Sequence, residues 1–385
     1  MTKDPRASDI QHFEWAFGLN RFVFGLMGVW PKKRPNDDSN SNSSFMSTNV
    51  LVIPGMIVLL VGGLIAPQMY ALSRIYDDFT LVIDNLTTVN PCVCAVMMLY
   101  FLWSNRDSVA RITKIIELDW LRDVQRSPGE RLTMLRYAGY GRTFTLSGCF
   151  ITIFAVLCFV VTPFLGLSFR LINNRTDQVG RRRIHLPLQS VYPGDYLRSP
   201  YYELCYAAQM LGGCIVGMTI AATDNFFAAL TFHASARCRV LAERMAGLAL
   251  IGIAREEEFF RALGASIREH VRIIRLVRTI ERIFNQLLLT KLICMPLVVC
   301  FVGLELIGSF GSESIRLTTL FAQVGALVTM VFHALIDCVA CEVLMKYEHQ
   351  PSRLRFRVVR FTRALCEMLH SDSHTAQVSA ETYGW

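Results

Sequence analysis

The chain has 385 residues, of which 52% are hydrophobic and only 18% are charged, and its formal net charge is +8. Soluble globular chains carry about 25% charged residues, so this composition excludes a disordered chain and one that wraps nucleic acid. It also argues against an ordinary soluble enzyme. The basic balance instead fits a membrane protein whose cytoplasmic loops are rich in lysine and arginine, and no nucleic-acid partner is expected.

Six apolar runs are long enough to cross a membrane, which takes about 20 residues for a helix. They lie at about 47–70, 81–103, 143–167, 203–232, 286–310 and 317–345. None of them shows the strict alternation in short segments that a spanning β-barrel requires. The predicted fold class is therefore all-α, a polytopic membrane helix bundle with six spanning helices.

The distribution of lysine and arginine predicts the orientation. With the N-terminus inside, about 30 of the 39 basic residues fall on the cytoplasmic side, as the positive-inside rule requires. We therefore expect a multi-pass protein of the plasma membrane with a cytoplasmic N-terminus. The sequon Asn174-Arg175-Thr176 then lies in an outer loop, where glycosylation of Asn174 is allowed. The expected parts are a cytoplasmic segment at 1–46, a bundle at 47–345 with a cytoplasmic helical extension at 233–285, and an atypical charged tail at 346–385.

The stretch that precedes the fifth run is predicted to be helical. Apolar residues recur in it at spacings of three and four, while arginines occupy another face. One interpretation is a surface helix that contacts anionic membrane lipid. We favour a continuation of the fifth helix into the cytoplasm that packs against neighbouring helices or subunits, and the two interpretations are compatible. The residues expected to anchor subunits are Ile267, Val271, Ile274, Val277, Ile280 and Phe284.

Charged residues within the spanning runs are candidates for function by default. Asp224, Lys291 and Asp337 are expected near the membrane interfaces or in helix pairing, because none shows the repeated spacing of a proton relay. His233 and His333 are interpreted as scattered single residues.

The chain carries no motif that predicts catalysis. It has no P-loop, nucleophile elbow or HExxH sequence. Cys338-x-x-Cys341 has no second pair and no histidine at a suitable spacing, so a helix contact is favoured over a metal site. We expect no enzyme activity, no metal and no cofactor.

Aromatic and soft side chains gather near the outer ends of the third, fourth and sixth runs. Small-molecule pockets are mostly apolar, carry a few placed polar groups and often lie between helices. The same side chains would also suit an interfacial aromatic belt or bundle packing, so both alternatives stay open. The residues predicted as ligand contacts are Phe159, Thr162, Phe164, Tyr202, Tyr206, Met210, Phe321 and Gln323.

Four motifs in chain order resemble the insect odorant receptor family. The first pairs Leu19-Asn20-Arg21 with Gly28-Val29-Trp30-Pro31. The most specific runs from Leu186 to Gln209, LPLQSVYPGDYLRSPYYELCYAAQ, and resembles the family's outer loop leading into its fourth helix. The others are CRVLAERMAGL at 238–248 and the apolar pattern from His270 to Phe284.

The resemblance implies a cytoplasmic N-terminus, seven helices and a heterotetramer with an odorant receptor coreceptor subunit. A volatile small-molecule odorant would bind among the second to sixth helices from the outer side and open a cation pore. Cytoplasmic extensions of the helices would anchor the subunits. An insect gustatory receptor-like chemosensory channel is the nearest alternative. A G-protein-coupled receptor fits less well, because it needs an outside N-terminus. A secondary transporter would need an internal repeat, which is not found.

The resemblance stops at Gln350. Residues 352–369 contain five arginines, too many for a spanning helix, and suggest at most an interfacial amphipathic helix. The polar tail from Ser371 is expected to be disordered. We therefore expect this chain to lack the family's seventh helix. The odorant-binding bundle would remain, but the truncated chain would not conduct ions.

Overall fold

The computed structural model describes residues 5–30, 51–121, 127–165, 167–168, 170–177, 185–196, 198–251, 256–310 and 317–348. These residues form helices and connecting loops, with no strand among them. The predicted amphipathic segment at 352–369 and the tail after it lie outside the described residues. The helices are α1 (Pro5–Leu26), α2 (Val52–Leu60), the π-helix η1 (Val61–Ile65), α3 (Ala66–Ile75), α4 (Phe79–Ser104), α5 (Arg106–Leu121), α6 (Pro128–Phe164), α7 (Asn174–Asp177), α8 (Tyr201–Ile251), α9 (Glu256–Phe310) and α10 (Leu317–Glu348).

Six helices in the described part of the chain are long and apolar enough to span a membrane: α2–η1–α3 as one rod, α4, α6, α8, α9 and α10. This confirms the all-α fold and the six predicted spans. Three helices are much longer than their apolar runs, since α6 begins at Pro128, α8 ends at Ile251 and α9 begins at Glu256. A span predicted from hydropathy ends where the first charged residues appear. The helix itself can continue into the water on either side of the membrane, where its charged residues are solvated.

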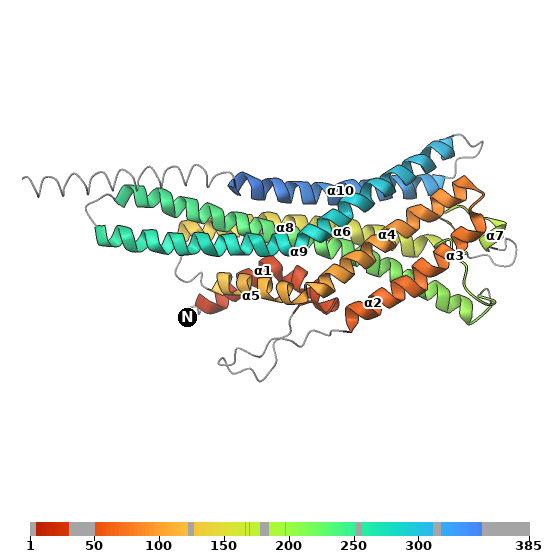
Figure 1. Cartoon of the computed structure of the whole chain (residues 1–385), viewed down its shortest axis with the longest axis horizontal. Coiled ribbons are helices and arrows are strands. Elements are labelled where there is room, and N and C mark those ends of the chain that lie inside the picture. Colours follow the sequence, from red (N-terminus) through yellow and green to blue (C-terminus); the bar gives the residue numbers. More distant parts are fainter. Residues whose placement is uncertain are drawn as a thin grey trace, which may run out of the picture.

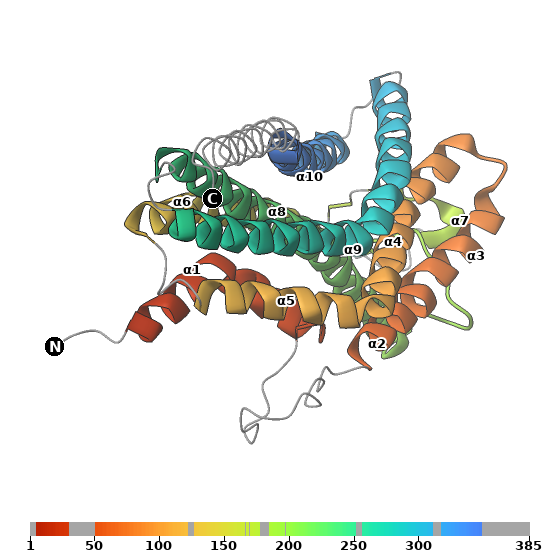
Figure 2. The same ribbon diagram turned by 60° about the vertical axis from the view of Figure 1, so that its left-hand side comes forward.

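The spanning helices alternate in direction (Figure 1). The α3–α4 connection and α7 lie at one end of the bundle, and the end of α8 and the start of α9 extend from the other. Helices α1 and α5 lie side by side toward this second end in both views (Figures 1 and 2). The described parts of the segments that the charge pattern assigns to the cytoplasm, α1, α5, the end of α8 and the start of α9, thus share one end of the molecule.

Local signals explain where several helices begin. Asp78 caps α4, because its Oδ1 accepts hydrogen bonds from the backbone N–H of Thr80 at 3.1 Å and of Leu81 at 3.3 Å. Ser127 caps α6, with Pro128 at the first helical position. These caps set where α4 and α6 begin.

Glycines let α8 approach its neighbours closely. A Cβ atom on Gly213 would lie 2.5 Å from the Phe159 ring of α6, and one on Gly212 would overlap Leu64 of η1. Small residues serve this purpose at helix contacts in membranes, where close van der Waals packing drives association. Further inward, Phe24 of α1 packs on Phe226 of α8, with ring centroids 4.6 Å apart.

The helix predicted before the fifth run is confirmed as the first half of α9, a single helix of 55 residues that continues into the span. Its buried face differs from the predicted stripe. Ile280 and Phe284 are almost fully buried within this chain, whereas Ile267 is 54% exposed and Val271 is 41% exposed. On a helix of 3.6 residues per turn, the residues of the predicted stripe wind gradually around the helix axis. Only the C-terminal end of the stripe therefore faces the core.

Candidate functional site

The outer loop folds back onto the outer end of the bundle. The backbone N–H of Val191 donates to the Pro67 carbonyl at 3.1 Å, and the Tyr192 hydroxyl donates to the Gly63 carbonyl at 2.7 Å. Gly63 belongs to the π-helix η1, and such bulges disturb the regular backbone ladder and are frequent at functional sites. The Gln209 side chain of α8 accepts a hydrogen bond from the backbone N–H of Leu188. Its Nε2 donates hydrogen bonds to the hydroxyl oxygens of Ser190 and Tyr192. The loop therefore joins the first spanning rod to α8.

A buried ion pair holds the start of the same loop. The Arg170 guanidinium is 2% exposed; its Nη1 donates to Asp177 Oδ2 at 3.0 Å, and its Nε donates to the Leu186 carbonyl at 3.1 Å. Burial alone would raise the pKa of the Asp177 carboxyl, but the hydrogen bonds and charge of Arg170 lower it below the ordinary value. The backbone N–H of Leu171 also donates to Asp84 of α4. The loop is thus fastened to three spanning segments: the first rod, α4 and α8.

Two predicted ligand contacts lie under this loop. Tyr202 is buried in a cluster with Tyr192 and Tyr196, and its ring centroid is 6.1 Å from that of Tyr206. Burial raises the pKa of Tyr192 to about 12, so its hydroxyl stays neutral and available for hydrogen bonds. The cluster gives the outer end an aromatic lining with polar tips.

The structure disperses the other predicted contacts. Phe159 lies against Gly213 between α6 and α8, and the Thr162 hydroxyl donates to the Cys158 carbonyl of its own helix. Met210 of α8 is half-buried, and Phe321 of α10 is 68% exposed. The Phe164 side chain lies outside the described residues.

Gln323 of α10 lies in a polar contact that joins three helices. Its Nε2 donates to Glu305 Oε2 of α9 at 2.8 Å, and the Thr87 hydroxyl of α4 donates to Glu305 Oε1 at 2.6 Å. Gln323 is 6% exposed. The amide of Gln323 is therefore oriented by an acid from a different helix.

A second polar group, the ion cluster, lies deeper in the bundle and links α6, α8, α9 and α10. Lys291 Nζ is 2.6 Å from Asp224 Oδ1 and also contacts Asp337. His333 Nδ1 is 2.8 Å from Asp224 Oδ2, and its Nε2 is 3.1 Å from the Thr152 hydroxyl oxygen. The interpretation of His333 as an isolated residue was wrong. Asp224 and Lys291 pair helices inside the bundle, and their side chains are at most 5% exposed.

The sequence carried one weak signal for this cluster. His333 and Asp337 are one turn apart on α10 and so share a face. Their partners lie on helices distant in sequence, which no local pattern reveals. His233 was also interpreted as isolated, and it lies 3.4 Å from Asp119 of α5.

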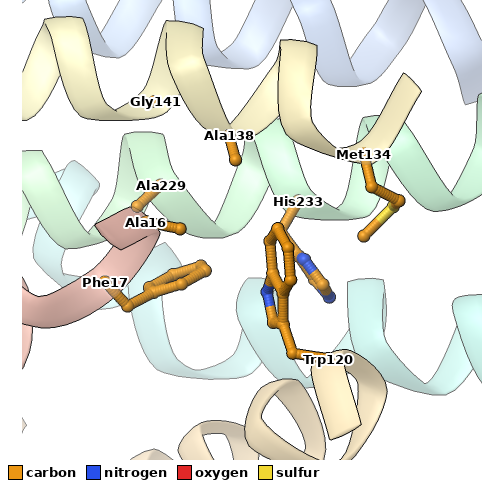
Figure 3. Close-up of a pocket in the computed structure, with 8 residues that line it drawn as sticks. All are labelled: Ala16, Phe17, Trp120, Met134, Ala138, Gly141, Ala229 and His233. Atoms are coloured by element: carbon orange, nitrogen blue, oxygen red, sulfur yellow. The ribbon is translucent and has the colours of Figure 1, made fainter. Parts of the chain in front are cut away.

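A small cavity lies between α1, α5, α6 and α8, toward the inner end (Figure 3). Its space suits about one water molecule. Trp120 and His233 face each other across it, and the Trp120 Nε1 has no hydrogen-bond partner among the described residues. None of the predicted ligand contacts lines it. The lining residues are Ala16, Phe17, Trp120, Met134, Ala138, Gly141, Ala229 and His233.

Comparison with known proteins gives consistent results. The family model described as 7tm Odorant receptor matches residues 78–350. Odorant receptor 13a of Drosophila melanogaster is 22% identical over 286 residues, which cover 73% of this chain and 66% of that receptor. The matched region is thus just under two thirds of that curated relative's length.

Two solved structures resemble the whole bundle. The insect olfactory receptor OR5 from Machilis hrabei aligns with a TM-score of 0.66 and 13% identity, over 88% of this chain and 82% of that one. Its complex with eugenol aligns with a TM-score of 0.65 and 15% identity, over 86% and 80%. At these identities the likeness establishes the shared fold.

Proposed function

The chain belongs to the odorant receptor family, and from this premise we propose that it is the odorant-binding subunit of an odorant-gated cation channel. The observation that carries the proposal is the family match over 78–350, which includes five of the six spanning helices and the outer loop. The M. hrabei receptor of the same fold has been solved in complex with eugenol, a small aromatic molecule. The basic segments at one end of the bundle support a cytoplasmic N-terminus in the plasma membrane.

We propose that the odorant binds in the outer half of the bundle and contacts the eight residues predicted from the sequence. Tyr202 and Tyr206 would contribute from beneath the outer loop, and Phe159 from the contact of α6 with Gly213. Gln323 would supply a polar contact whose direction is set by Glu305. An apolar site with few polar groups suits volatile ligands, because selectivity then depends on shape and one or two hydrogen bonds.

The proposed partner is a coreceptor subunit in a heterotetramer. Ile267 and Val271 are exposed in this single chain although α9 continues beyond its apolar span at this point. Exposed apolar side chains in an aqueous region favour burial by another subunit. Within the spans, Phe150, Leu292 and Ile307 are each more than 70% exposed, which suits contact with membrane lipid or a subunit.

Coexpression with a coreceptor, with current recorded against an odorant panel, tests the proposed function. Tyr206→Ala and Phe159→Ala should each change the half-maximal concentration of at least one effective odorant by about tenfold, because each removes a large contact from an apolar site. Leu292→Ala on the exposed face of α9 is the matched control and should leave the profile unchanged. Surface biotinylation verifies delivery of every variant.

Two results would contradict the proposal. A delivered wild-type chain that neither binds any odorant nor responds to one with the coreceptor present would refute the receptor function. Binding without current would match the expected loss of conduction. Unchanged profiles for both Tyr206→Ala and Phe159→Ala would remove these residues from the proposed site and leave the receptor function standing.

A further inference from the structure

The cavity between α1, α5, α6 and α8, which we call the inner cavity, exists because its walls carry few bulky side chains. Four of its eight lining residues are small: Ala16, Ala138, Gly141 and Ala229. Small residues on facing helices leave a space here in an otherwise closely packed interior. The inner cavity has room for about one water molecule.

The Trp120 indole brings an unsatisfied hydrogen-bond donor to this space. Its side chain rises from α5 between Phe17 and His233, with the indole nitrogen on the side of Phe17 (Figure 3). Trp120 is 1% exposed, and its Nε1 has no hydrogen-bond partner among the described residues. An indole nitrogen only donates, so its partner must be an acceptor. Native proteins rarely leave a buried donor unpaired, because its lost hydrogen bond to water is then not replaced.

His233 is the other lining residue whose side chain carries nitrogen atoms. It is 4% exposed, its ring centroid lies 6.3 Å from that of Trp120, and Phe17 meets it edge-on at 6.0 Å. Its Nε2 lies 3.4 Å from Asp119 Oδ2 of α5. The cavity thus has polar groups on one side and apolar groups on the other. A cavity with apolar walls alone stays empty, whereas one with polar partners and sufficient room holds water.

We propose that the inner cavity holds one ordered water molecule that accepts a hydrogen bond from Trp120 Nε1 and contacts the His233 ring. The water links α5 to α8 beneath α1, in addition to the contact of His233 with Asp119. A larger ligand does not fit the space. An ion is disfavoured because no acid, lysine or arginine is among the described residues that line the cavity. This inference goes beyond the proposed function and does not depend on it.

Two glycines of α6 provide a matched test. A Cβ atom on Gly141, which lines the cavity, would lie 3.5 Å from the Ala229 Cα. One on Gly139, which is not a lining residue, would lie 3.8 Å from the Trp15 ring. Both positions accept a methyl group at ordinary contact distance, so Gly141→Ala and Gly139→Ala gain the same helix propensity. Only Gly141→Ala takes space from the water.

Thermal unfolding of the purified full chain in lipid nanodiscs measures the difference. Gly139→Ala should raise the midpoint temperature by about 2 °C, because alanine is the better helix former. Gly141→Ala should lower it by about 2 °C, because the water is displaced and the Trp120 donor is left unpaired. In a Trp120→Phe background, which has no donor to leave unpaired, Gly141→Ala should raise the midpoint as Gly139→Ala does.

Nuclear magnetic resonance detects the water directly. The chain is labelled with ¹⁵N-tryptophan, and the Trp120 indole N–H resonance is identified by its loss in Trp120→Phe. A bound water should transfer magnetisation to this N–H in the wild-type chain and in Gly139→Ala. The transfer should disappear in Gly141→Ala.

Each result decides the proposal. Equal increases in the midpoint for both glycine variants, or no transfer from water to Trp120 in the wild-type chain, would overturn it and show that the cavity is empty. A decrease caused by Gly141→Ala that persists in the Trp120→Phe background would also overturn it, because crowding would then be the cause. The comparison of the two glycine variants needs no change at Trp120, so it decides even if Trp120→Phe fails to fold.

Discussion

The outer end and the ion cluster both bury polar side chains but differ in how these groups are paired. At the outer end the buried amides are those of Gln68, Asn85 and Gln189. In the ion cluster, Lys291 lies between Asp224 and Asp337, so opposite charges bring three helices together. At the outer end, Asn85 Oδ1 and both side-chain amide atoms of Gln189 have no hydrogen-bond partner within the described part of the chain, although they are shielded from solvent. The ion pairs join helices through opposite charges, whereas these amide atoms contribute no side-chain hydrogen bond among the described residues. Loss of the Lys291 charge is therefore expected to destabilise the chain, whereas loss of an unpaired neutral amide is not.

The largest effect is expected at Lys291. Lys291→Met leaves two carboxylates without their cation inside the membrane, so we expect a loss of about 3–5 kcal/mol in the free energy of unfolding. Thermal unfolding of the purified chain and surface biotinylation measure it. Adding Asp224→Asn and Asp337→Asn should restore much of the loss, because the stranded charges are then removed. Leu292→Met, its exposed neighbour, is the control; stability of Lys291→Met equal to that of this control would show that the ion cluster does not hold the helices.

A smaller effect with a defined pH dependence is expected at Asp177. Its pKa is lowered in the folded chain, so the stabilisation is present at neutral pH and is lost as the pH falls through the carboxyl range, from about pH 5 downward. Asp177→Asn should cost about 2 kcal/mol at pH 7, because a charged hydrogen bond to Arg170 is lost. Stability measured from neutral to acidic pH should show the two chains converging. A constant difference across that range would contradict the assignment.

The smallest effects on stability are expected at the outer loop. Two variants there compare a hydrogen-bonded side chain with one whose polar atoms have no partner among the described residues. Tyr192→Phe removes the hydroxyl that bonds Gly63 and Gln209 and should cost about 1 kcal/mol. Gln189→Met removes side-chain atoms that have no hydrogen-bond partner among the described residues and should be neutral or slightly stabilising. Thermal unfolding of both variants tests this. A clear destabilisation by Gln189→Met without ligand would mean that the amide has a structural partner.

The sequence predicted the elements of the fold better than the contacts between them. The six spans and the helical start of α9 were found because hydropathy and helical periodicity depend on residues close together in the chain. The exposed position of Phe321 and the burial of Ile280 in this chain's own core were not predicted. Both depend on how a helix is rotated against its neighbours, and an apolar helix in lipid gives little indication of that rotation.

Composition and charge pattern by themselves determined that this is an all-α membrane bundle, and the four motifs pointed to the family that the match over 78–350 then established. Only the tertiary structure decided that Asp224, Lys291 and His333 meet, and that Gln189 of the outer loop is buried beside Asn85. The physical reason is that the two kinds of interaction act over different distances along the chain. Burial in lipid depends on the residues of one segment and can be predicted from that segment alone. Pairing between polar groups needs atoms within about 3 Å of each other, and helices distant in sequence bring their atoms this close only after they pack.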